Sequence, residues 1–379
     1  MATRGTVPTR YWRRLADGRV QCDLCPRACR VHEGQAGFCF VRACEGGEIV
    51  LTAYGRSSGI GVDPIEKKPL FHFRPGTAVL SLGTAGCNLG CLYCQNWDIS
   101  RSREIDTLSR AASPERIATA AQALGCESVA FTYNDPVIFH EYAIDVAAAC
   151  HDLGLGSVAV TAGYVCAEPR AEFYRFMDAA NVDLKSIRGS FYERVCLGHL
   201  QPVLDTLTYL KRETKVWLEI THLVIPGEND SDEDFDALTR WMAEHLGPDV
   251  PLHLTAFHPD YRMLDHPPTR RATLRRAWTI ATGNGLRYVY TGNVRDPERE
   301  TTRCHQCGAA LVGRDGYRLT QWTLAEGRCR ACGAACAGVF DRAPGTWGAR
   351  TLPVRLDDAP GWVRPPGPSA HEGAPPESL

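Results

Sequence analysis

Short apolar runs alternate with longer amphipathic stretches between residues 77 and 296. The runs are rich in β-branched residues, which favours buried strands, whereas the longer stretches have the apolar spacing of helices. Strands are expected at 78–83, 128–133, 157–161, 182–185, 216–221, 252–256 and 288–290. Helices are expected over stretches such as 114–124, 136–151, 172–179 and 232–246, the last preceded by good capping residues at 229–231. This alternation predicts repeated βα units around a parallel sheet.

The number of these units favours a barrel over a doubly wound sheet. Six or seven units in about 220 residues suit a partial or full βα barrel, and in either architecture chemistry gathers at the carboxyl ends of the strands. We therefore predict an α/β fold in four parts. These are a cysteine-rich metal-binding region at 1–76, a core barrel at 77–297, a second cysteine-rich module at 298–350, and a disordered tail rich in proline and glycine at 351–379.

Composition and charge argue against several classes of protein. Of 379 residues, 42 are basic and 44 acidic, so a net charge of -2 gives no overall attraction to nucleic acid or to an anionic membrane. The basic start lacks the apolar stretch of a secretory signal, and no eighteen consecutive residues are apolar. We expect a cytoplasmic protein that does not associate with a membrane.

The 17 cysteines are unusual for such a chain, because in the cytosol clustered cysteines more often bind metal than form disulfides. Most of them fall into three groups, which are Cys22, Cys25, Cys29, Cys39 and Cys44, then Cys87, Cys91 and Cys94, then Cys304, Cys307, Cys329, Cys332 and Cys336. Four others have no close cysteine neighbour, and we expect Cys126, Cys150, Cys166 and Cys196 to be small buried or half-buried side chains.

The central group follows a predicted strand, where an α/β protein presents a cofactor-binding loop. Three thiolates without a fourth leave one iron of a cluster free to bind a substrate, whereas electron-transfer clusters have four. Gly83, Gly86 and Gly90 are expected to let the backbone wrap around a bulky cluster, and Tyr93 to shield one face of the site. The alternative is a zinc knuckle completed by a distant histidine.

The spacing Cys-x3-Cys-x2-Cys, with aromatic Tyr93 before the last cysteine, resembles the signature of the radical S-adenosylmethionine (SAM) superfamily. The resemblance implies that Cys87, Cys91 and Cys94 hold a 4Fe-4S cluster whose open iron binds SAM. It also implies reductive cleavage of SAM to a 5'-deoxyadenosyl radical that abstracts hydrogen from a substrate. The implied fold is a partial (βα)6-type TIM barrel with the cluster loop after its first strand.

Tyr133, Asn134 and Asp135 close the second predicted strand. They resemble the element of this family that receives the SAM amino group, although the usual glycine pair and glutamate are replaced. The alternative is an Asn-Asp-Pro turn that only starts a helix.

Asp183 and Lys185 alternate along a strand and project to the same side, where each needs the other or a ligand as a partner. They resemble the Asp-Leu-Lys element that contacts SAM in glycyl radical enzyme activases, and the alternative is a structural pair. His258 looks like the strand-six histidine that meets SAM in activases, whereas His222 is equally suited to substrate binding. Residues 290–293 are candidates to cap the pocket.

The outer cysteine groups predict two further metal sites. Two Cys-x2-Cys turns in the carboxyl-terminal module form a zinc-ribbon pattern, and a rubredoxin-like iron is the alternative. In either case the metal ligands are Cys304, Cys307, Cys329 and Cys332. At the other end, zinc or a second cluster is expected on Cys22, Cys25, Cys29 and Cys39.

Together, these motifs over about residues 20–350 resemble the radical SAM member of the AmmeMemoRadiSam system, which is related to pyruvate formate-lyase activating enzymes. The resemblance implies an electron donor such as flavodoxin or ferredoxin, and AMMECR1-like and Memo-like proteins as partners. The substrate stays open between a protein, a small molecule and an RNA. The rival hypothesis is a noncatalytic metal-binding scaffold.

Overall fold

The computed structural model describes residues 6–101 and 110–356, and its centre is a mixed sheet of nine strands. The order across this sheet is β16-β15-β14-β13-β12-β11-β9-β8-β22, and all neighbours are parallel except those involving β8 and β22. Its strands are β8 (Gly59–Pro64), β9 (Ala78–Gly83), β11 (Ser128–Phe131), β12 (Gly156–Thr161), β13 (Ala179–Asp183), β14 (Trp217–Val224), β15 (Leu252–Ala256), β16 (Val289–Gly292) and β22 (Leu352–Pro353). The predicted α/β class and partial barrel are confirmed.

Helices connect the parallel strands and cover the sheet. The longer ones are α3 (Pro114–Ala123), α4 (His140–Asp152), α5 (Ala167–Tyr174), α7 (Gln201–Glu213), α8 (Asp232–His245) and α9 (Arg271–Gly283). Short ones are η1 (Ile65–Lys67), α1 (Trp97–Ser100), η2 (Pro136–Phe139), α6 (Gly189–Phe191), η3 (Tyr192–Cys196) and α10 (Pro297–Glu300). Ser231 caps α8 as predicted, because its side chain accepts a hydrogen bond from the backbone N–H of Asp234 at 3.1 Å.

The prediction of a helix at 172–179 is wrong in position. Helix α5 ends at Tyr174, and Ala179 already begins strand β13. Residues 175–178 form the turn between α5 and β13, and pairing of β13 with β12 and β14 on either side makes Ala179 extended. Within this buried strand, Asn181 donates to the carbonyl of Pro69 and accepts from Thr221, so each polar atom of its side chain has a partner.

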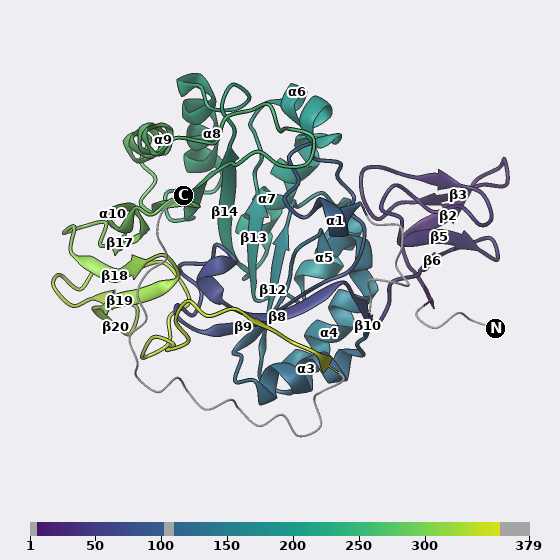
Figure 1. Cartoon of the computed structure of the whole chain (residues 1–379), viewed down its shortest axis with the longest axis horizontal. Helices are drawn as coiled ribbons and strands as arrows, with labels where there is room; N and C mark the ends of the chain where they lie inside the picture. Colours follow the sequence, from purple (N-terminus) through teal and green to yellow (C-terminus); the bar gives the residue numbers. More distant parts are fainter. Residues whose placement is uncertain (1–5, 102–109, 357–379) are drawn as a thin grey trace.

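Two small modules lie on opposite sides of the barrel (Figure 1). The amino-terminal module contains two three-stranded sheets, formed by β1 (Val7–Pro8), β5 (Arg42–Glu45) and β6 (Glu48–Leu51), and by β2 (Trp12–Arg14), β3 (Val20–Cys22) and β4 (Arg30–Val31). The carboxyl-terminal ribbon consists of β17 (Thr302–Arg303), β18 (Ala310–Asp315), β19 (Arg318–Trp322), β20 (Leu324–Ala325) and β21 (Arg328–Cys329). A separate pair joins β7 (Arg56–Ser57) to β10 (Arg110–Ala111).

The barrel sheet extends past both predicted boundaries of the core. Strand β8 pairs with β9 although it precedes residue 77, and β22 pairs with β8 although it lies in the predicted disordered tail. Backbone pairing orders these segments even though β22 has little to bury. The rest of the predicted tail, 357–379, lies outside the described residues. In the described part, every helix is too short or too polar to cross a membrane.

Candidate active site

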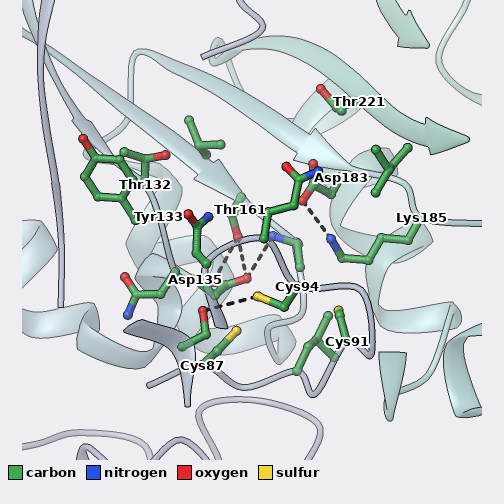
Figure 2. Close-up of a pocket in the computed structure, with 18 of the residues that line it drawn as sticks. Cys87, Cys91, Cys94, Thr132, Tyr133, Asp135, Thr161, Asp183, Lys185 and Thr221 are labelled. Carbon is green, nitrogen blue, oxygen red and sulfur yellow. Dashed lines mark hydrogen bonds and ion pairs between the residues drawn. The ribbon is translucent and has the colours of Figure 1, made fainter. Parts of the chain in front are cut away.

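A cavity of about 290 Å³ opens at the carboxyl ends of the parallel strands. Its lining includes Cys87, Cys91, Tyr93, Cys94, Thr132, Tyr133, Asn134, Asp135, Thr161, Asp183, Lys185, Thr221, Leu223, Thr255 and Asn293. Figure 2 shows the three cysteines on one side of the cavity and Thr161, Asp183 and Thr221 on strands across it. Parallel strands that end at one edge bring together side chains far apart in the chain.

The glycines of the cysteine loop make room for protein atoms. A methyl group on Gly86, whose φ is +86°, would overlap the carbonyl oxygen of Cys39, and one on Gly83 would overlap that of Thr132. At Gly90 a methyl carbon would lie 2.8 Å from the side chain of Leu197. Packing against other loops therefore requires these glycines, and the positive φ of Gly86 is a further reason for glycine there.

The three central thiols are free and partly buried. Burial raises the pKa of Cys87 and of Cys94, so a bound cation is required to hold them as thiolates at neutral pH. No histidine lines this cavity among the described residues, which argues against the zinc-knuckle alternative. In a cubane each thiolate ligates a different iron, so a loop that spreads three thiols around a cavity suits a cluster better than one ion.

Cys196 lies beside this group, although it was predicted only as an isolated buried thiol. Hydrogen bonding with Cys196, followed by burial, raises the pKa of Cys91 well above its ordinary value. The Tyr93 hydroxyl lies 3.7 Å from the Cys196 sulfur. Backbone bonds from Gly90 N–H to the carbonyl of Cys196 and from Leu92 N–H to that of Val195, both 2.9 Å, hold the two segments together. Cys196 ends the π-helix η3, a geometry that no spacing in the sequence signals.

Asn134 and Asp135 hold the loops around the cavity in place. The Asn134 amide donates to the carbonyl of Gly86 at 2.8 Å and accepts from the backbone N–H of Thr84 at 3.1 Å, which fixes the start of the cysteine loop. Asp135 accepts from the backbone N–H groups of Val137 and Ala162 and from the Thr161 hydroxyl. It caps η2, which is what the alternative interpretation of a helix-starting turn predicts, and it also lines the cavity. Tyr133 lines the cavity with φ of 72°.

Asp183 and Lys185 face the cavity as a pair, with the ammonium nitrogen 2.8 Å from the carboxylate (Figure 2). Burial acts to lower the pKa of Lys185, but the charge of Asp183 outweighs it and holds this pKa well above its ordinary value. The cavity therefore contains a fixed cation near Cys91.

The two histidines lie outside the lining. His258, which was expected to meet SAM, does not line the cavity: β15 ends at Ala256 and the side chain of His258 is exposed beyond it. His222 is buried with its Nδ1 2.9 Å from the carbonyl of Leu184. Alternation along β14 explains this, since Thr221 and Leu223 face the cavity and the residue between them faces away. Of residues 290–293, Asn293 lines the cavity.

Comparison with known proteins shows the family of this chain. The radical SAM superfamily profile matches residues 81–239. The uncharacterized protein MJ0808 of Methanocaldococcus jannaschii is 38% identical over 325 residues, which cover 85% of this chain and 96% of that protein. The chain belongs to the radical SAM superfamily. It is therefore an enzyme of the class that uses an iron–sulfur cluster and SAM.

Other similarities are shorter or weaker. The 4-hydroxyphenylacetate decarboxylase activating enzyme of Clostridium scatologenes is 28% identical over 117 residues, 30% of this chain and 37% of that protein. A domain of pyruvate-formate lyase-activating enzyme from Bacteroides vulgatus aligns with 44% of this chain and 99% of its own, at 19% identity and a TM-score of 0.39. A radical SAM methyltransferase from Sphaerobacter thermophilus aligns with 76% of each chain, at 14% identity and a TM-score of 0.47.

The ribbon of this radical SAM enzyme contains a four-cysteine group. The sulfurs of Cys304, Cys307, Cys329 and Cys332 all lie within 4.8 Å of one another. Two pairs are 3.5 and 3.7 Å apart, close to the ~3.8 Å between sulfurs that a tetrahedron with Zn–S bonds of about 2.3 Å requires. Burial raises the pKa of Cys304, but backbone N–H groups of Cys307 and Gln306 outweigh it and lower this pKa to about 7.

The amino-terminal cysteines of this radical SAM enzyme also gather in space. A small cavity of about 20 Å³ is lined by Cys22, Cys25, Cys29 and Cys39. Burial raises the pKa of Cys22, Cys25 and Cys39, and the proximity of the other thiols adds to it. Cys44 lies apart from them, with its sulfur 3.6 Å from Glu33.

Proposed function

We propose that Cys87, Cys91 and Cys94 hold a 4Fe-4S cluster with an open iron, and that SAM binds beside it in the 290 Å³ cavity. When bound, the reduced cluster supplies the electron that cleaves SAM to methionine and a 5'-deoxyadenosyl radical, which abstracts hydrogen from the substrate. The observation that supports this assignment is the arrangement of three partly buried free thiols around a cavity whose described lining contains no histidine and no other cysteine, since Cys196 lies behind Cys91 and outside this lining.

In this proposal the remaining residues position ligands. The Asp183–Lys185 pair offers a carboxylate and an ammonium to the charged ends of SAM. Asp135 is held by two backbone N–H groups and the Thr161 hydroxyl, so it orders the loop between the cavity and η2. Asn134 keeps the cysteine loop at a fixed distance from β11 through the Gly86 carbonyl.

The substrate class is a further part of the proposal. The similarity to an activating enzyme over 117 residues favours hydrogen abstraction from a glycine of a partner protein, with a small molecule or an RNA as alternatives. We also propose membership of the AmmeMemoRadiSam group, with AMMECR1-like and Memo-like partners and a flavodoxin or ferredoxin as electron donor. Affinity capture with purified AMMECR1-like and Memo-like proteins tests directly whether these two proteins bind the chain.

Anaerobic reconstitution with iron and sulfide, followed by a dithionite-dependent assay for 5'-deoxyadenosine, tests the reaction. The wild-type protein should form 5'-deoxyadenosine from SAM, and Cys91→Ala should form none. Cys126→Ala is the matched control, because this cysteine is buried away from the cavity and its replacement should leave the product level unchanged. A reconstituted wild-type protein that forms no product would support the scaffold hypothesis instead.

The outer cysteine groups are proposed as separate metal sites. We assign zinc to the ribbon on the sulfur spacing, and a metal ion or second cluster to the amino-terminal module. Metal analysis should find one zinc per chain fewer in Cys307→Ser than in wild type. In Cys25→Ser it should find the amino-terminal metal missing. Unchanged metal content in either variant would refute the corresponding site.

A further inference from the structure

A second cavity, of about 470 Å³, lies between the barrel and the ribbon. Its walls come from η1 and the segment after it, from the ends of β15 and β16, and from the turn between β18 and β19 at residues 315–317. Figure 1 shows this ribbon hairpin beside the edge of the barrel. The cavity shares three lining residues, Pro69, Thr255 and Asn293, with the cavity that contains the central cysteines. The two spaces therefore adjoin.

The cations on the walls of the second cavity already have partners. The Lys67 ammonium lies 2.9 Å from the carboxylate of Asp63. Arg295 makes two bonds, of 3.0 and 2.9 Å, to the carboxylate of Asp315 on the ribbon hairpin. Because these positive charges are matched within the protein, the walls offer little attraction to an anionic ligand.

Two residues that line the same cavity each have a buried polar atom with no hydrogen-bond partner among the described residues. These atoms are Oε2 of Glu66 and the hydroxyl oxygen of Thr291, and each residue is only 1% exposed. The other oxygen of Glu66 accepts a hydrogen bond from the backbone N–H of Gly76 at 2.9 Å and lies 3.9 Å from the guanidinium of Arg314. By contrast, both carboxylate oxygens of Glu300 on the same cavity wall accept backbone N–H groups.

A buried carboxylate oxygen without a donor is costly unless a ligand supplies one. Burial raises the pKa of Glu66 to about 7, against the opposing charge of Arg314. A ligand that brings a positive charge and N–H donors would satisfy the free oxygen and favour the ionised form. An anionic or purely apolar ligand would leave Glu66 unsatisfied.

We propose that this cavity binds a cationic group of the substrate, an alkylammonium or alkylguanidinium, with Glu66 and Thr291 as its hydrogen-bond acceptors. The assignment rests on the proposed function, because the shared residues Thr255 and Asn293 would connect the bound group to the site where SAM is cleaved. A substrate bound in this way would have a lysine- or arginine-like or polyamine portion in the second cavity and its reacting carbon in the first.

Calorimetric titration of the reconstituted, SAM-loaded protein at pH 7.5 tests this inference with four small probes. These are n-butylammonium and n-butylguanidinium as cations, n-butanol as the neutral isostere, and butanoate as the anion. We expect both cations, or one of them, to bind at least tenfold more tightly than butanol and butanoate. The stronger cation identifies which of the two groups the substrate carries.

The variants locate the binding. Glu66→Gln should weaken the cations at least tenfold, and Thr291→Val severalfold, whereas Glu127→Gln, an exposed carboxylate outside the cavity, should bind them as wild type does. Circular dichroism checks that each variant is folded, and if Glu66→Gln fails to fold, Thr291→Val and the probe selectivity of wild type decide.

The inference would be overturned if wild type bound all four probes with equal affinity. It would also be overturned if a folded Glu66→Gln bound the cations as tightly as wild type does. Wild type that forms 5'-deoxyadenosine but shows no preference for cations would refute the inference alone. Wild type that prefers cations but forms no 5'-deoxyadenosine would refute the proposed function and leave a cation site without its assigned role.

Discussion

His72 connects the barrel to the ribbon and should make the stability of this junction depend on pH. Its ring is fully buried, with Nδ1 2.6 Å from the carbonyl of Ala337 on the ribbon and Nε2 2.5 Å from the hydroxyl of Tyr290 on β16. This arrangement assigns the proton to Nδ1, because a carbonyl can only accept. Nε2 then accepts from Tyr290, whose oxygen also lies 2.8 Å from the Thr302 hydroxyl.

Protonation of this ring is unfavourable in the folded protein. Burial lowers the pKa of His72 from 6.5 to about 4, with Arg314 and His253 acting in the same direction and Glu219 opposing them. A proton on Nε2 would also displace the hydrogen bond from Tyr290. The folded state therefore stays neutral in a range where the unfolded chain takes up a proton, so stability is present above pH 6.5 and is lost as pH falls toward 4.

The size of the effect follows from the two pKa values. One pKa unit is worth about 1.36 kcal/mol, so the loss attributable to His72 is about 2 kcal/mol at pH 5 and roughly 3 kcal/mol at pH 4. Equilibrium urea unfolding of wild type and His72→Gln, between pH 7.5 and 5, measures it. The free energy of unfolding should fall by about 2 kcal/mol more in wild type than in the variant. Subtracting the unfolding free energy of the variant from that of wild type cancels the contribution of the carboxylates and cysteines that both proteins contain. Curves that stay parallel over this range would refute a neutral, buried His72.

Three further predictions concern the two modules and the cysteine loop. Gly86→Ala should destabilise the fold by at least about 3 kcal/mol in urea unfolding, because a left-handed φ is combined with overlap of the Cys39 carbonyl, whereas Gly125→Ala, with positive φ but open space, should cost only about 1 kcal/mol. Arg42→Met should lower the free energy of unfolding by about 3 to 5 kcal/mol, because it leaves buried Glu141 without its ion-pair partner, while Arg240→Met at an exposed pair should cause no measurable change. Chelation of the zinc proposed for the ribbon should unfold it, observed as a change in Trp322 fluorescence, and leave the iron content of the reconstituted protein unchanged; a ribbon that stays folded without metal would contradict a structural role.

Local pattern was sufficient for the fold but not for the orientation of single residues at strand ends. The strands at 78–83 and 252–256 were predicted with their observed bounds, because buried parallel strands form continuous apolar runs between turns. Their spacing singled out Cys87, Cys91 and Cys94, and all three line the same cavity. His258 lies exposed outside the cavity lining although the end of its strand was predicted correctly, because the strand pattern does not determine the direction of the loop that follows.

Other features depend on contacts that no short segment contains. The proximity of Cys196 to Cys91 arises from pairing between the cysteine loop and a π-helix more than a hundred positions away. The helix predicted at 172–179 failed because the chain turns at 175–178 to enter β13, whose position is set by its pairing with β12 and β14. No sequence pattern marks Glu66, since only the fold shows that one of its oxygens lacks a donor within the described part of the chain.

The pairing of β22 with β8 also sets an order of events during synthesis. Strand β8 is the first strand of this sheet in the sequence, and one of its edges pairs with β9. Its other edge gains a partner only when Leu352 and Pro353 have been synthesised, after the barrel and the ribbon. Until then the nascent chain presents an open sheet edge, the kind of surface that other chains can join. Proline at this late strand suits the position, because it ends the sheet with a residue that cannot donate a backbone hydrogen bond to a further strand.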